Sequence, residues 1–205
     1  MLSPEESMDI TPPEIIMPAI PEEVVLHTPL TYDFSATDDI SGVAFLRGFL
    51  NGDEISQGAV VPAMPVGGYI FEAKTSDRAS NPRSSDIRYD VVYQFGGFLP
   101  PLEGGGIYKK NRTIPVKFRL ADYNGEFITS ALAHLYTAKI ENGIIREELS
   151  AISSSKANDG NRFRYDDEED QYIFNLSTKD MESGEWRLRV ELDDWRNYTI
   201  VISIQ

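Results

Sequence analysis

The stretch Thr113-Ile114-Pro115-Val116-Lys117-Phe118-Arg119-Leu120 indicates the fold most clearly. Its apolar and polar residues alternate, as expected for a β-strand with one buried face. Pro115 lacks a backbone N–H, which is tolerated near the start of a strand or at a sheet edge. Lys117 falls on the outer face. The predicted inner face consists of Ile114, Val116, Phe118 and Leu120.

The composition excludes several classes of function. A formal net charge of −14 over 205 residues argues against nucleic acid and anionic membranes as partners, since both need clustered Lys and Arg. There is no cysteine, which excludes disulfides and thiolate chemistry. No apolar run approaches the roughly 18 residues of a membrane helix, and no signal peptide is visible. The abrupt start suits a piece of a longer chain; a cytosolic protein and a removed signal are the alternatives.

Residues 1–9 are polar and acidic, and they predict a linker or a disordered lead. Residues 10–93 contain about seven short alternating segments with turn signals every 8–12 residues, typical of an immunoglobulin-like β-sandwich. Asn51-Gly52 is a strong hairpin signal within this half.

Residues 94–205 predict a second β-sandwich. Residues 172–176, 186–192 and 198–204 alternate clearly, and the context favours strand over helix for 131–140. Residues 150–161 are polar and predict a loop. No long Ser/Gly linker separates the halves, so we expect a limited hinge at Gly96-Gly97. The predicted fold class is therefore all-β, with two tandem immunoglobulin-like β-sandwich domains.

Three segments of the first half carry a family resemblance. They are Thr-Pro-Pro-Glu-Ile at 11–15, Ala-Thr-Asp-Asp-Ile-Ser-Gly-Val at 36–43, and the run from Gly68 to Asn81. Together they resemble the immunoglobulin-like repeats of bacterial and archaeal surface proteins. Ser80 stands where those repeats usually have Gly.

The second half resembles the PxKF domain, a tail or repeat unit of secreted and surface-attached prokaryotic proteins. The matching segments are residues 93–101, Arg-Thr-Ile-Pro-Val-Lys-Phe at 112–118, 166–174, 184–190 and 198–204. The Pro-x-Lys-Phe tetrad that gives the family its name corresponds to residues 115–118, and its three defined positions are Pro115, Lys117 and Phe118. The family has no established catalytic residues, so the resemblance implies a structural role for these three.

Two groups of acidic residues are candidates for calcium, which prefers hard oxygen ligands. The first is the run at 166–170, in which Asp166, Asp167 and Asp170 would be ligands. It lacks the spacing of an EF-hand loop, so a solvated hairpin tip is favoured over a calcium site. The second group lies in predicted turns at one end of the first sandwich. Here capping of the turns by the Asp side chains is favoured over a calcium site. Its members are Asp38, Asp39 and Asp77.

No pattern indicates catalysis. His27 and His134 lack metal-ligand spacing, and no G-x-S-x-G elbow is present. A sugar-stacking platform of Trp186, Trp195 and Tyr198 is weighed against a core Trp186 with an exposed Trp195, and the second is favoured. We therefore expect no enzyme activity and no cofactor apart from the calcium alternative.

The predicted function is a non-catalytic structural or adhesive module of a secreted or cell-surface prokaryotic protein, acting as spacer, stalk or anchor. Its partners would be neighbouring domains of a longer chain, with glycans or other surface proteins as alternatives, and neither nucleic acid nor a membrane span. Two other functions stay open. One is a carbohydrate-binding accessory module of a secreted hydrolase. The other is a subunit of a surface filament that donates a strand from 1–16 or 200–205.

Overall fold

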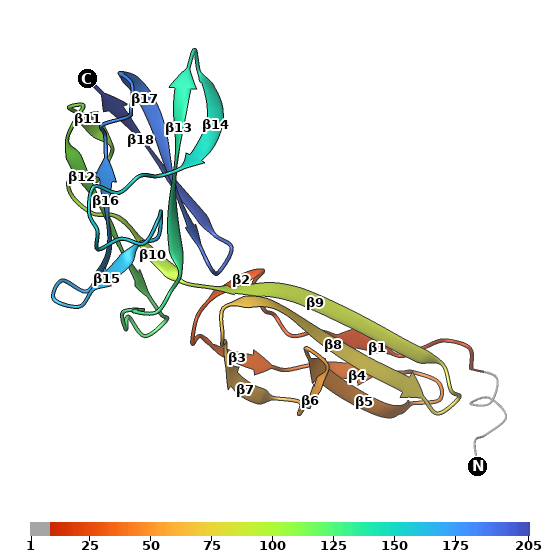
Figure 1. Cartoon of the computed structure of the whole chain (residues 1–205). Helices are drawn as coiled ribbons and strands as arrows, with labels where there is room; N and C mark the ends of the chain where they lie inside the picture. Colours follow the sequence, from red (N-terminus) through yellow and green to blue (C-terminus); the bar gives the residue numbers. More distant parts are fainter. Residues whose placement is uncertain (1–8) are drawn as a thin grey trace. The chain divides into compact units, whose positions relative to one another are not determined.

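A computed structural model describes residues 9–205, and their regular secondary structure consists of β-strands (Figure 1). The chain divides into two compact units, Met1–Val92 and Tyr93–Gln205. Each contains several β-sheets, which confirms the predicted all-β fold with two tandem β-sandwiches. Except for Asp9, the predicted lead at 1–9 lies outside the described residues. Among residues 9–205, no helix has the length and apolarity needed to cross a membrane.

The first unit contains one large sheet and two small ones. The large sheet has the order β2-β9-β8-β5-β6, and the small sheets pair β3 with β7 and β1 with β4. All pairs are antiparallel except β2 with β9, which is parallel. The strands are β1 Glu14–Ile16, β2 Glu23–Val25, β3 Pro29–Tyr32, β4 Ser35–Thr37, β5 Val43–Leu50, β6 Asp53–Ile55, β7 Ala59–Pro62, β8 Gly67–Asp77 and β9 Pro82–Val92.

Aromatic side chains fill the core of the first unit. The rings of Tyr32 and Phe71 lie 5.2 Å apart, and the hydroxyls of Tyr32 and Tyr89 share a hydrogen bond of 2.5 Å. This bond satisfies two polar groups that burial would otherwise leave unpaired. Gly48 on β5 makes room for Phe34, because a Cβ at Gly48 would lie 2.5 Å from the Phe34 ring. A close approach of strand and ring therefore requires glycine at this position.

The second unit contains a four-stranded and a five-stranded sheet (Figure 1). One has the order β10-β12-β16-β15 and the other β11-β18-β17-β13-β14. Only β11 with β18 is a parallel pair. The strands are β10 Gln94–Phe98, β11 Gly106–Tyr108, β12 Thr113–Ala121, β13 Ala133–Glu141, β14 Ile144–Ser150, β15 Arg164–Asp166, β16 Gln171–Ser177, β17 Gly184–Leu192 and β18 Asn197–Ile204.

Strand β12 alternates as predicted. Its inner-face residues are at most 2% exposed, whereas Lys117 lies half-buried on the outer face. Pro115 pairs with Asn175 of β16, while β10 pairs with β12 only between Phe118 and Ala121. At Pro115, strand β12 therefore has a neighbouring strand on one side only. The missing N–H of Pro115 interrupts no hydrogen bonding between strands.

Two expectations need correction or extension. The hinge predicted at Gly96-Gly97 is wrong, because both glycines lie within β10, whose pairing with β12 shifts register between Phe95 and Phe98. Residues 131–140 lie largely in strand β13, as favoured, but β14 was not predicted. Asn142-Gly143, with φ of 52° and 76°, forms the turn between these two strands. Residues 151–161 contain no strand.

Candidate functional site

Three carboxylates gather in the first unit. One oxygen from each of Asp9, Asp38 and Asp77 lies within 4.8 Å of the other two. Asp9 is 7% exposed and Asp77 is 2% exposed, and Asp38 is half-buried. We call these three residues the carboxylate cluster. Asp39, predicted as a fourth member, is exposed and does not belong to it.

Turn geometry holds two members of the carboxylate cluster. Asp38 Oδ1 accepts hydrogen bonds from the backbone N–H of Ser41, at 2.9 Å, and of Gly42, at 2.7 Å. This is the turn capping favoured from the sequence. Asp9 Oδ2 accepts a bond of 2.8 Å from the Ser41 hydroxyl, and Asp9 Oδ1 accepts one of 2.9 Å from the Thr11 N–H. Ser41 therefore ties Asp9 to Asp38.

Asp77, the third member, ends β8 and is held by the turn after that strand. Its oxygens accept hydrogen bonds of 2.7 Å from both the backbone N–H and the side-chain amide of Asn81. That amide also donates to the Asp9 carbonyl at 3.0 Å. Burial raises the pKa of Asp77, but the hydrogen bonds from Asn81 outweigh it and hold the pKa below its ordinary value. Asp77 is therefore ionised at neutral pH.

The carboxylate cluster concentrates negative charge. Two unit charges 4 Å apart repel by about 4 kcal/mol at the effective dielectric constant typical near a protein surface. A cation would offset this repulsion, and an all-oxygen donor set suits a hard ion such as Ca²⁺. Sequence reasoning found Asp38 and Asp77 but missed Asp9, which was assigned to the lead. No local pattern marks Asp9, because its position depends on the contacts with Ser41 and Asn81.

The run at 166–170 behaves differently. Asp166 ends β15 and the next four residues are exposed. Arg119 holds this tip by donating to the backbone carbonyls of Glu169, at 2.9 Å, and Asp170, at 3.2 Å. Among residues 9–205, no metal-holding group includes Asp166, Asp167 or Asp170. The placement fits the solvated hairpin tip favoured from the sequence.

The signature residues of the second unit serve its packing. The Phe118 ring stacks on Tyr172 at 5.1 Å and meets Phe163 edge-on at 4.9 Å. Lys117 lies opposite Ile173, and its carbonyl accepts a hydrogen bond of 2.8 Å from the Leu99 N–H. These contacts fix the fold around β12 rather than form a reaction centre.

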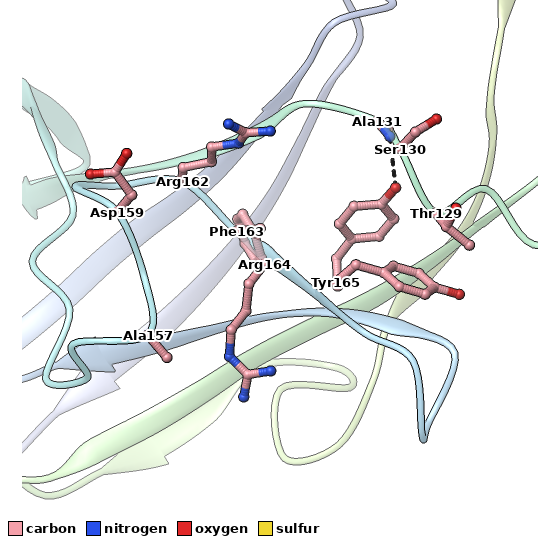
Figure 2. A pocket seen from close by; sticks show the side chains of 10 residues that line it. Thr129, Ser130, Ala131, Ala157, Asp159, Arg162, Phe163, Arg164 and Tyr165 are labelled. Atoms are coloured by element: carbon pink, nitrogen blue, oxygen red, sulfur yellow. Dashed lines mark hydrogen bonds between the residues drawn. The ribbon is translucent and has the colours of Figure 1, made fainter.

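A cleft of about 290 Å³ lies in the second unit beside β15 (Figure 2). The Arg162 guanidinium points toward Ser130, whereas Arg164 extends to the opposite side of Phe163 (Figure 2). The two guanidinium groups therefore do not meet at one point of the cleft. The Asp159 carbonyl accepts a hydrogen bond of 2.9 Å from the Arg162 N–H. Tyr172 accepts a 2.9 Å hydrogen bond from the Ala131 N–H, which supports the wall of the cleft.

The three aromatic residues considered for sugar stacking are separated. Trp195 is 66% exposed in the turn after β17, with φ of 63°. Trp186 pairs with Ile202, while Tyr198 pairs with Val190 four residues further along β17. Tyr198 also stacks on Phe95 at 3.8 Å. These contacts do not form a platform. The exposed Trp195 agrees with the favoured alternative, but the expectation of a core Trp186 is wrong, because Trp186 is only half-buried and its indole N–H donates to the carbonyl of the exposed Glu182.

No family model matches the chain, and no curated protein matches it. Solved structures with tandem β-sandwiches do resemble it. The fibronectin(III)-like modules of CbhA from Clostridium thermocellum share 12% identity, with a TM-score of 0.31, 94% of this chain covered and 92% of that one. The Ig1-2 module of the Drosophila receptor protein tyrosine phosphatase DLAR shares 12% identity, with a TM-score of 0.32 and coverages of 95% and 100%.

A glycan-binding protein of Bacteroides ovatus, SGBP-B, determined in complex with a mixed-linkage heptasaccharide, is also similar. It shares 12% identity, with a TM-score of 0.30; 94% of this chain and 47% of that chain are covered. These TM-scores are all below 0.5, and we draw no functional conclusion from them.

Proposed function

We propose that the chain is a non-catalytic spacer of a secreted or cell-surface prokaryotic protein, placed between neighbouring domains. The observation that carries this proposal is the path of the chain through each unit. Within each unit the chain enters at one end of the sandwich and leaves at the other. A module that the chain crosses lengthwise keeps the domain before it apart from the domain after it.

In the first unit, Asp9 is bonded to Asn81, just before β9 begins. Strand β9 then runs for 11 residues to Val92, a length of about 36 Å. In the second unit, the N–H of Tyr93 donates to the Asp194 carboxylate in the turn before β18, at 2.9 Å. Strand β18 carries the chain from that turn to Ile204 at the opposite end.

Other features support a surface module. The two family resemblances agree with a surface protein, and the net charge of −14 favours a solvated, self-repelling exterior. Strand donation is a weaker alternative, because part of each proposed donor is already paired. Strand β1 pairs with β4, and β18 lies between β17 and β11.

Domain replacement in the parent protein tests the spacer. Replacing residues 9–205 by an unrelated tandem β-sandwich of similar length should preserve the parent's activity, whereas deletion should impair it. Loss of activity in the replacement would contradict the proposal, since it would mean that specific residues of this chain are needed. Protease treatment of intact cells should release peptides of this chain if it is exposed at the surface.

A second candidate function is calcium binding by the carboxylate cluster, favoured by the convergence of Asp9, Asp38 and Asp77. The ion would join Asp9 to two turns of the first unit. Calcium at 100 times its dissociation constant would stabilise that unit by about 2.7 kcal/mol.

Calorimetric titration with CaCl₂ after EDTA treatment tests this candidate. Asp38→Asn should abolish the calcium-dependent rise of the unfolding temperature, and the matched control Asp167→Asn, which also removes one carboxylate, should keep it. No heat of binding, or the same loss in both variants, would exclude the cluster as the site.

A further inference from the structure

A polar recess of about 420 Å³ opens where β12 begins and β16 ends. Thr113 and Ser177 pair across these two strands. The Thr113 hydroxyl also shares a hydrogen bond of 2.8 Å with the hydroxyl of Ser154 on the adjoining loop. Three hydroxyls from three neighbouring segments thus meet in one recess. Its full lining is Asn111, Arg112, Thr113, Ser154, Ser177 and Lys179.

The recess has a charge opposite to that of the whole chain. Arg112 and Lys179 line it, and no carboxylate does. Asp180 lines a different recess, and Glu182 is ion-paired with Lys139. In a chain of net charge −14, the lining of this recess therefore carries two cations and no carboxylate.

A buried threonine fixes the loop that carries Arg112. Thr178 is 0% exposed. Its hydroxyl accepts a hydrogen bond of 2.8 Å from the Arg112 N–H, and its own N–H donates to the Arg112 carbonyl at 2.9 Å. The backbone of the recess is therefore ordered before any ligand arrives, and binding has to order only the two long side chains.

We propose that this recess binds the acidic groups of an anionic polysaccharide. A guanidinium fork and an ammonium match the oxygens of a carboxylate or a sulfate ester. The hydroxyls and the Asn111 amide can exchange hydrogen bonds with sugar hydroxyls. No aromatic ring lines the recess, so recognition depends on charge rather than on stacking. This inference is independent of the spacer role.

Titration of the full chain with defined polysaccharides tests the proposal. The probes are oligogalacturonate for carboxylate, dextran sulfate for sulfate, neutral dextran, and inorganic sulfate. At least one acidic polymer should bind, and binding should weaken as salt rises. Neutral dextran should not bind. Binding of inorganic sulfate as tight as that of the acidic polymers would overturn a polysaccharide site, as would tighter binding of double-stranded DNA.

Paired variants locate the site. Arg112→Ala with Lys179→Ala should weaken binding at least about tenfold, because each charge-assisted hydrogen bond is worth roughly that much. The control, Arg83→Ala with Arg88→Ala, removes the same charge from exposed positions of β9 and should change affinity less than twofold. Equal weakening in both pairs would mean that only overall charge matters, and it would overturn the proposed site.

A third variant removes recess hydroxyls without changing charge. Thr113→Ala with Ser154→Ala should weaken the acidic polymer that binds, while leaving the thermal unfolding midpoint of the second unit nearly unchanged. An unchanged affinity in this variant and in Arg112→Ala with Lys179→Ala would overturn the proposal.

Discussion

The two groups of acidic residues in this chain differ in how their spacing along the sequence compares with their positions in the structure. Residues 166–170 are the densest acidic run in the sequence, yet four of the five lie exposed at a hairpin tip. Asp9, Asp38 and Asp77 are far apart in sequence, yet their carboxylates converge. Density along the chain therefore does not predict a site, whereas segments that the sandwich brings to one end can build one.

The physical reason lies in local geometry. Consecutive residues at a hairpin tip project in different directions, and water solvates their charges at little cost. Members of the carboxylate cluster come from three separate segments, and neighbouring backbone and hydroxyl donors fix each one. The two groups should therefore respond very differently to substitution.

The largest effect is expected for Asp9→Ala. It removes the carboxylate that accepts the 2.8 Å hydrogen bond of the buried Ser41 hydroxyl and the 2.9 Å bond of the Thr11 N–H, so the free energy of unfolding of the first unit should fall by about 2 to 3 kcal/mol. Urea unfolding followed by far-UV circular dichroism measures it. Both tryptophans lie in the second unit, so tryptophan fluorescence serves as an internal control. A rise in stability would mean that charge repulsion within the cluster dominates.

Glu148→Gln should cost less, about 1 to 2 kcal/mol in the second unit. The Glu148 carboxylate is ion-paired with two arginines. Arg189 and Arg187 donate hydrogen bonds to it at 2.6 and 2.7 Å. The hydrogen bond from Arg189 lowers the pKa of Glu148. Its contribution is therefore complete above its ordinary pKa of 4.5 and is lost as the pH falls through the lowered value.

The pH dependence provides the check on Glu148. Unfolding of wild type and variant, followed by tryptophan fluorescence, should differ at neutral pH and converge in acid. A difference that stays constant down to pH about 2 would show that packing, rather than charge, accounts for the loss.

Ser80→Gly should stabilise the first unit by about 1 kcal/mol. Ser80 has φ of 74° in the turn that positions Asn81 against Asp77, and a side chain in this left-handed region is strained. Thermal unfolding should show a higher midpoint with unchanged cooperativity. A lower midpoint would mean that the flexibility of the unfolded chain outweighs the relieved strain.

The smallest effect is expected for D166N/D167N/D170N. Arg119 holds this tip through backbone carbonyls, so loss of the carboxylates should change the stability of the second unit by less than about 0.5 kcal/mol. Urea unfolding followed by tryptophan fluorescence measures it. A loss as large as that of Asp9→Ala would remove the contrast between the two groups.

Local patterns predicted most of the fold and only part of the cluster. Alternation located β12, and Asn51-Gly52 marked the turn between β5 and β6. The glycines at 96–97 were misread as a hinge, because glycine in a register shift of a paired strand has the same sequence signature as glycine in a linker. Ser80, which stands where the repeats that the first half resembles usually have Gly, has a positive φ.

Asp9 and the recess residues could not be predicted, because their neighbours come from distant segments. Asn81 and Ser41 hold Asp9, and β16 and a loop residue complete the recess around Thr113. Long-range pairing of this kind is set by the fold as a whole and leaves no periodic signal in the residues concerned.

The parallel pairs β2 with β9 and β11 with β18 have a mechanical consequence. In each unit, a short strand near its beginning lies alongside its final strand and runs in the same direction. Tension applied to the two ends of a unit would therefore pull these strands past each other in shear. Their hydrogen bonds would have to rupture together, whereas strands peeled from one end lose them singly. A protein on a cell surface under flow would gain resistance to stretching from this arrangement.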